Sequence, residues 1–127
     1  MESQSEQLLQ DVYDLKTLLG NKWSPAIMVA LANGPMRRSD LFSTVSAYAA
    51  DMRHARKPLT LHDSILTREL RNLVQRGILV RASAGKTFPP MVTYALKPEV
   101  LDFLRLSGEL SSWLRQHTSL VAPAAGK

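Results

Sequence analysis

The sequence predicts a mainly α-helical domain that carries a small β-hairpin. Three observations support this fold class: apolar residues recur at helical spacing along much of the chain, two short β-prone runs follow each other near residues 78–96, and glycine and proline mark the joins. With 127 residues, of which 45% are hydrophobic and 21% charged, the chain has the size and composition of one globular domain. We expect residues 1–121 to form that domain and 122–127 to be a disordered tail.

The helical segments follow from apolar spacing and from residues that begin or end helices. Helices are expected over 5–19, from Ser24 to the "NGP" break at 33–35, from a cap at Ser39 onward, over about 60–76, and from Pro98 to 117. Ser24 followed by Pro25 offers a side-chain cap and then a proline at the first helical position. "MRR", which precedes Ser39, is expected to be extended, and residues 47–50 are able to lengthen the third helix.

The fourth of these helices has two contrasting faces. In "SILTRELRNLVQRGILV", an apolar stripe that should face a core consists of Leu66, Leu70, Leu73 and Val74. The opposite face carries polar and basic residues, namely Ser64, Arg68, Arg71 and Gln75. Gly77 stands where the helix should end. Such a face is typical either of a solvated helix or of a helix that lies in a DNA groove.

Two strand-like runs, "GILVRASAG" and "MVTYAL", are joined by "AGKTFPP", which suits an exposed hairpin tip. The resulting order of elements is that of a winged helix-turn-helix whose core spans about 24–96. The helices at 5–19 and 98–117 are left over and are too apolar to stand exposed. We therefore expect them to be dimerisation helices that pack across a two-fold axis.

Positive charge is concentrated in the middle of the chain. The net charge is +5 and the sequence pI about 9.9. Residues 37–86 hold ten basic and four acidic residues, a balance of +6, whereas 1–36 hold two and four, a balance of −2. Residues 87–127 hold four basic and three acidic residues, a balance of +1. A basic middle segment indicates a polyanionic partner.

Other function classes find little support. The chain has no cysteine, which excludes disulfides, thiol switches and cysteine zinc sites, and its three histidines have no compact metal-binding spacing. Glu69 and Asp63 are interpreted as solvated carboxylates, and no phosphate loop or nucleophile motif occurs, so we expect neither an enzyme nor a metal or cofactor site. The acidic, polar N-terminus and the absence of a long apolar run predict a cytoplasmic protein with no membrane partner.

Four segments carry a resemblance to a known family: "GNKWSPAIMVAL", "GPMRRSDL", "ILTRELRNLVQRGIL" and "PPMVTYAL". In this order they resemble the HxlR-type winged-helix transcription regulators, relatives of the MarR group, from about Leu18 to Val100. The resemblance implies a cytoplasmic homodimer that binds palindromic DNA through the fourth helix and the wing. The chain departs from the family in lacking its cysteine near the first helix, in carrying Arg38 in place of an aromatic residue, and in a longer link before the fourth helix.

The residues that we predict to contact DNA are mostly basic and lie on the fourth helix, on the wing, or in the turns beside them. They are Ser64, Thr67, Arg68, Arg71, Arg37, Arg38, Lys86, Arg81, His62, Arg53, Arg56 and Lys57. A guanidinium bridges the O6 and N7 atoms of guanine or holds a phosphate, and a lysine at a hairpin tip reaches the backbone. The alternative for each is a solvated side chain. For His62 the alternative is a helix cap, and for Arg38 it is a structural role.

With no thiol, the expected signal is a small apolar or aromatic effector that binds without a covalent bond and releases a repressor from DNA. Its predicted pocket lies between the end helices near Trp113, Phe103, Tyr48 and Met52, with residues 46–60 as the coupling segment; the alternative is that these side chains complete the dimer core. Trp23 and Tyr94 are expected to pack under the wing. Rival functions are a protein-interaction module whose basic face binds an acidic partner, and a drug-sequestering regulator.

Overall fold

The protein is described by a computed structural model over residues 3–20, 22–50, 60–85 and 91–120. Its helices and strands in chain order are α1 (Gln4–Leu19), α2 (Ser24–Ala30), η1 (Leu31–Asn33), β1 (Met36–Arg37), α3 (Arg38–Ala50), α4 (Asp63–Gln75), β2 (Leu79–Ala84), β3 (Met91–Leu96), α5 (Pro98–Leu106), α6 (Gly108–Gln116) and η2 (Thr118–Leu120). The mainly helical fold with a small sheet that the sequence predicts is confirmed, and its order is that of a winged helix-turn-helix.

The strands of the described residues form one three-stranded antiparallel sheet in the order β1-β3-β2. β2 and β3 are the predicted hairpin, with Leu79 opposite Leu96 at its base. β1 is the expected extended piece, and it adds to the other edge of β3, where Met36 lies opposite Tyr94. This third strand fixes the turn before α3 against the wing.

The core lies between α2, α3, α4 and the base of the sheet. α4 buries Leu66, Leu70 and Leu73 completely, as its apolar stripe predicts. They pack in one cluster with residues of the other elements, including Ile27, Met28, Leu31, Leu41, Val45, Ile78, Leu79 and Leu96. Each such side chain stabilises the fold by about 2 kcal/mol when it leaves water, so the inner face of α4 anchors this helix to the core.

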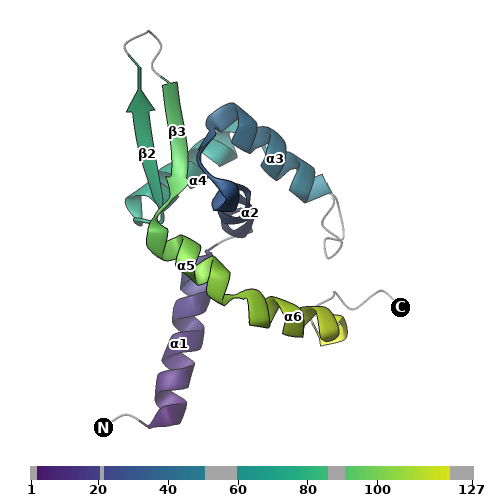
Figure 1. The fold of residues 1–127 in the computed structure, drawn as a ribbon. Coiled ribbons are helices and arrows are strands. Elements are labelled where there is room, and N and C mark those ends of the chain that lie inside the picture. The colour runs from purple at the N-terminus through teal and green to yellow at the C-terminus, as the bar shows by residue number, and fades with distance from the viewer. Residues whose placement is uncertain (1–2, 21, 51–59, 86–90, 121–127) are drawn as a thin grey trace.

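Two parts of the chain stand away from this core. α1 and α6 leave the core at the end opposite to the β2–β3 hairpin (Figure 1). Neither α1 nor α6, both fully described, contains a buried residue, and α5 contributes only Val100 to the buried set. Exposed apolar side chains on these elements include Leu8, Leu9, Val12, Tyr13, Leu110 and Trp113.

The ends of several helices differ from the expectation. α4 ends as predicted, because Gly77 adopts φ 79° and the backbone N–H groups of Gly77 and Ile78 donate to Val74 and Leu73. Ser24 is not the cap of α2: the capping position is Trp23, and Ser24 is a buried first-turn residue. It lies under Gly20, where an added Cβ would come within 2.8 Å of its Oγ. Likewise α3 begins at Arg38, before the expected cap at Ser39.

The predicted last helix over 98–117 is two helices. α5 ends at Leu106 and α6 begins at Gly108, with Ser107 between them at ψ 0°. The Ser107 hydroxyl donates to the Leu104 carbonyl at 2.6 Å, at the last turn of α5. Serine–glycine pairs are a common site of helix kinks, and the leucine spacing that runs across this pair concealed the break.

Candidate nucleic-acid interface

The exposed face of α4 is continuous and polar. His62, Ser64, Thr67, Arg68 and Arg71 are all exposed, on the side of the helix opposite to the buried leucines. The Arg68 side chain is 72% exposed, and its Nε lies 3.9 Å from the Glu69 carboxylate, a long contact that leaves most of the guanidinium accessible. His62 occupies the N-cap position but gives α4 no side-chain capping bond, so the capping alternative for it is not borne out.

Glu69 corrects one sequence interpretation. We expected a solvated carboxylate, but its side chain is only 5% exposed. It follows Arg68 along the helix and therefore turns toward the core side. The other carboxylate of that pair, Asp63, is exposed and has a structural role described next.

Arg38 fixes the first turn of α4. Its guanidinium lies 3.1 Å from the Asp63 carboxylate and donates to the Asp63 backbone carbonyl and to Thr67 Oγ1, both at 2.8 Å. The structural role that the sequence left open for Arg38 is therefore present in the fold. Thr67 accepts one bond here, and its hydroxyl proton remains able to donate to another group.

A groove of about 330 Å³ separates α4 from the sheet. Its lining combines three guanidinium groups with polar and apolar side chains: Arg38, Thr67, Leu70, Arg71, Val74, Gln75, Arg81 and Tyr94. Arg71 comes from α4, Arg81 from β2 and Arg38 from the start of α3. This groove brings together candidates from three elements that are distant in sequence, and a phosphate oxygen would meet a positive potential there.

Two polar groove residues, Gln75 and Tyr94, were not among the candidates. Tyr94 was expected to pack under the wing, and it does lie half-buried on β3, directly opposite Arg81. Gln75 is the residue one turn after Arg71 on the polar face of α4. Helical spacing already placed Gln75 on this outer face, although it was not predicted to be a contact, and no sequence signal pairs α4 with Tyr94.

The remaining candidates divide into three groups. Ser64 and Arg68 lie on the exposed face of α4, outside the groove lining, and Arg37 is exposed on β1 opposite Thr93. Lys86 and the basic cluster of Arg53, Arg56 and Lys57 lie outside the described residues. Among the described residues, no group of three or more histidine or carboxylate side chains is arranged to hold a metal ion.

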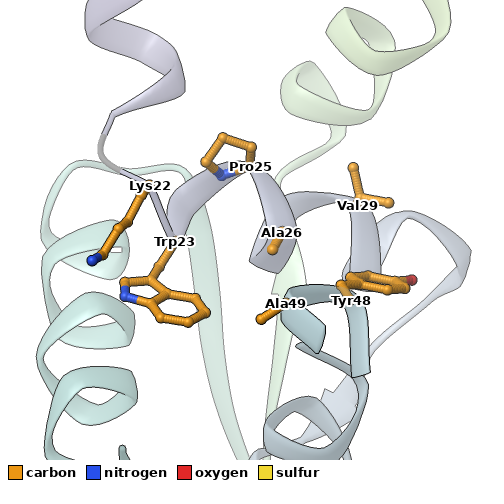
Figure 2. A pocket seen from close by; sticks show the side chains of 7 residues that line it. All are labelled: Lys22, Trp23, Pro25, Ala26, Val29, Tyr48 and Ala49. Carbon is orange, nitrogen blue, oxygen red and sulfur yellow. The ribbon is translucent and has the colours of Figure 1, made fainter. Parts of the chain in front are cut away.

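Of the predicted effector-site residues, Tyr48, Phe103 and Trp113 are described, and they lie on α3, α5 and α6 respectively. Tyr48 lines a separate apolar pocket of about 390 Å³ between α2 and α3, beside Trp23 (Figure 2). Trp113 lies instead on α6, 47% exposed, with its ring stacked on His117 at 4.3 Å. Phe103 packs at the edge of the core, and Met52 lies outside the described residues. Trp23 is buried as expected, and one side of its ring lies beside the end of α3.

A family model described as HxlR-like helix-turn-helix matches residues 18–121. The chain belongs to this family. Its members are helix-turn-helix transcription regulators, so this chain is a DNA-binding transcription regulator. The match extends beyond the resemblance seen in the sequence, to include α5 and α6.

Solved structures agree on the fold. A MarR-family regulator from Enterococcus faecalis V583 is 24% identical, with a TM-score of 0.64, over 96% of this chain and 94% of that one. The reduced form of YodB from B. subtilis is 22% identical, with a TM-score of 0.62, over 91% and 94%. The regulator ytfH from Salmonella typhimurium is 25% identical, with a TM-score of 0.54, over 87% and 86%. No curated protein sequence gave a significant match. In the described part of this HxlR-like chain, no helix has the length and apolar character needed to span a bilayer.

Proposed function

We propose that this HxlR-like regulator is a homodimeric repressor that reads a palindromic operator with two copies of α4 and leaves it when a small apolar ligand binds. The observation that carries the proposal is the polar outer face of α4, with Arg68 and Arg71 accessible and the three-arginine groove beside it. A major groove admits one such helix, and a guanidinium recognises guanine bidentately.

The contacts of each arginine in the structure indicate whether it would position α4, contact a base or contact the DNA backbone. Arg38 has most of its donors occupied by α4, so we assign it to positioning the helix. Arg68 is directed to solvent and is assigned to base reading. Arg71 and Arg81 share the groove and are assigned, with Arg37, to the phosphate backbone. Lys86, Arg53, Arg56 and Lys57 remain predicted backbone contacts.

The homodimer is proposed from the apolar residues of the end helices. α1 exposes Leu8, Leu9, Val12 and Tyr13, and α6 exposes Leu110 and Trp113. A second copy that covered these residues would remove them from water and place two α4 helices about one DNA turn, roughly 34 Å, apart. The helices over 5–19 and 98–117 therefore keep their predicted dimerisation role in this proposal.

Selection of bound duplexes from a random library at two salt concentrations tests the proposal. We expect an enriched imperfect palindrome with half-sites one turn apart, and an affinity that falls steeply with salt because several phosphates are contacted. Unselective binding that disappears at the higher salt would refute base reading. It would favour the rival in which the basic face binds an acidic protein partner.

A further inference from the structure

The pocket between α2 and α3 has the form of a slot with aromatic walls. Trp23 and Tyr48 lie on its two sides, and Ala26 and Ala49 form the surface between them (Figure 2). Trp23 is buried, whereas Tyr48 is 39% exposed and leaves the slot accessible from solvent. The two alanines matter because a methyl group is the smallest side chain that keeps a helix regular, so they hold the slot open without disturbing either helix.

The lining is almost entirely apolar. The one charged contributor is Lys22, an exposed residue whose Nζ lies 6.0 Å from the centre of the Trp23 ring. Figure 2 shows this amine on the far side of Trp23 from Tyr48, and the Tyr48 hydroxyl directed away from the slot. A volume of about 390 Å³ falls in the usual range for small-molecule sites. A charged ligand would therefore lose its hydration with little in return.

We propose that this slot binds an uncharged, planar aromatic compound of about two fused rings, stacked between Trp23 and Tyr48; the inference rests on the ligand release contained in the proposed function. Aromatic rings favour offset-stacked or edge-to-face neighbours, and Trp23 and Tyr48 offer one such neighbour on each side of the slot. The slot differs from the effector site expected from sequence, with which it shares only Tyr48.

α3 connects the slot to the DNA-reading helix. Tyr48 and Ala49 lie near the C-terminal end of α3, and Arg38, which holds Asp63 and Thr67 of α4, is its first residue. A 13-residue helix is about 20 Å long, so the slot and the Arg38 guanidinium lie at opposite ends of one continuous helix. A ligand that shifts α3 relative to α2 therefore also shifts the guanidinium that fixes the first turn of α4.

Isothermal titration calorimetry of the full chain with 2-naphthol tests the site without DNA. We expect micromolar binding, at least tenfold weaker binding in Ala26→Leu, which fills the slot, and unchanged binding in Ala32→Leu. Ala32 is an exposed residue of η1 outside the slot, so it controls for the same substitution. Tyr48→Ala removes one wall at a partly exposed position and should also weaken binding tenfold; it serves if Ala26→Leu does not fold.

Each of the remaining experimental outcomes would contradict one part of the proposal. Equal affinities in all variants, or no heat with the unmodified chain, would overturn the site. Tighter binding of 2-naphthoate than of 2-naphthol would overturn the assignment of an uncharged ligand. No binding together with dissociation of Ala26→Leu into monomers would mean that a second copy fills the slot. If 2-naphthol binds but operator affinity is unchanged by it, the slot stands and the proposed ligand release fails.

Discussion

The helix-turn-helix core and the end helices of this protein differ in how far their apolar side chains are buried. α2, α3 and α4 each contain side chains that are fully removed from solvent, such as Ile27, Leu41 and Leu66. α1 and α6 are amphipathic as well, yet within the described chain their apolar sides meet solvent, with Leu9 55% exposed. The core therefore has the contacts of a complete fold, while the end helices expose apolar surface of the kind that marks interaction sites.

The two end helices are also attached to the core in different ways. α1 is held through its C-terminal end, where Arg76 donates to the Thr17 carbonyl at 2.7 Å and Gly20 turns the chain with φ 72°. α5 is held by apolar packing of Val100, and α6 follows it after the Ser107 kink. Each attachment fixes the end of the helical segment next to the core, but most of the segment's length must be stabilised by other contacts.

The largest expected effect comes from a charge on α1. Leu9→Glu should leave the core folded, because α1 contributes no buried residue, but should convert the proposed dimer to a monomer. Losing one of two half-sites is expected to weaken operator binding by about 100-fold or more. Sedimentation velocity and operator titration at the same protein concentration measure the two effects.

Gln10→Glu is the matched control, since it adds the same charge at the next exposed residue of α1. It should change neither the association state nor operator affinity. If the Leu9→Glu protein remained dimeric, the exposed leucines of α1 would have no role in association. The proposed difference between the core and the end helices would then be wrong.

The second effect separates base reading from backbone contact within the core. Arg68→Ala should cost about 1–3 kcal/mol on the selected operator and less on random duplexes. Arg71→Ala, one turn away in the arginine groove, should weaken both kinds of duplex by similar factors and reduce the salt slope by about one. Parallel titrations on the two duplexes decide this, and equal losses for Arg68→Ala would remove it from the base-reading role.

The sequence correctly predicted the elements of the core wherever residues recur at a regular helical or strand spacing. The stripe from Leu66 to Leu73, the stop at Gly77 and the two hairpin strands were all predicted, because each depends on local spacing. β1 has only two residues, too few to show a period. Glu69 stands three residues after Leu66 and four before Leu73, so its burial agrees with the helical spacing, and its charge led to the expectation of a solvated side chain.

For the candidate site, the sequence predicted individual residues but not which of them lie close together in the fold. Helical spacing put Arg68 and Arg71 on one exposed face, and the structure agrees. That Arg38 holds Thr67 across 29 positions, or that Arg81 and Arg71 share a groove, depends on the tertiary packing of α3 and the sheet. The apolar slot was missed for the same reason, since its walls come from two helices about 25 residues apart in the chain.

The third effect tests whether Arg38 acts by positioning. Arg38→Met removes three bonds to the first turn of α4, and since the pair is partly exposed we expect a loss of about 1 kcal/mol in unfolding free energy. Operator and random duplexes should both be bound more weakly. Arg71→Met makes the same change where the described structure contains no hydrogen bond or ion pair, so its unfolding free energy should stay the same. Urea denaturation of the two variants makes the comparison, and equal stabilities would count against a positioning role.

The smallest effect concerns the free end of α1. The Ser3 backbone N–H donates to the Glu6 carboxylate at 2.9 Å, and the Glu6 N–H donates to Ser3 Oγ at 3.1 Å, which forms a capping box. The backbone bond from Ser3, followed by the bond with its side chain, lowers the pKa of Glu6 below its ordinary value of 4.5.

Because the pKa of Glu6 is lower in the folded than in the unfolded chain, its contribution to the stability of α1 is complete above the unfolded pKa and is lost as the pH falls through the folded value. We expect the protection factors of the first-turn amides of α1, which correct for the intrinsic pH dependence of exchange, to fall as Glu6 becomes protonated at acidic pH, while α2, which contains no carboxylate, keeps its protection. Glu6→Gln preserves a capping partner without a titrating group, so exchange in that variant should not depend on Glu6 protonation. An identical pH response in the two proteins would show that α1 is held by something other than its own cap, and the described arm would then be less independent of the core than its exposed leucines indicate.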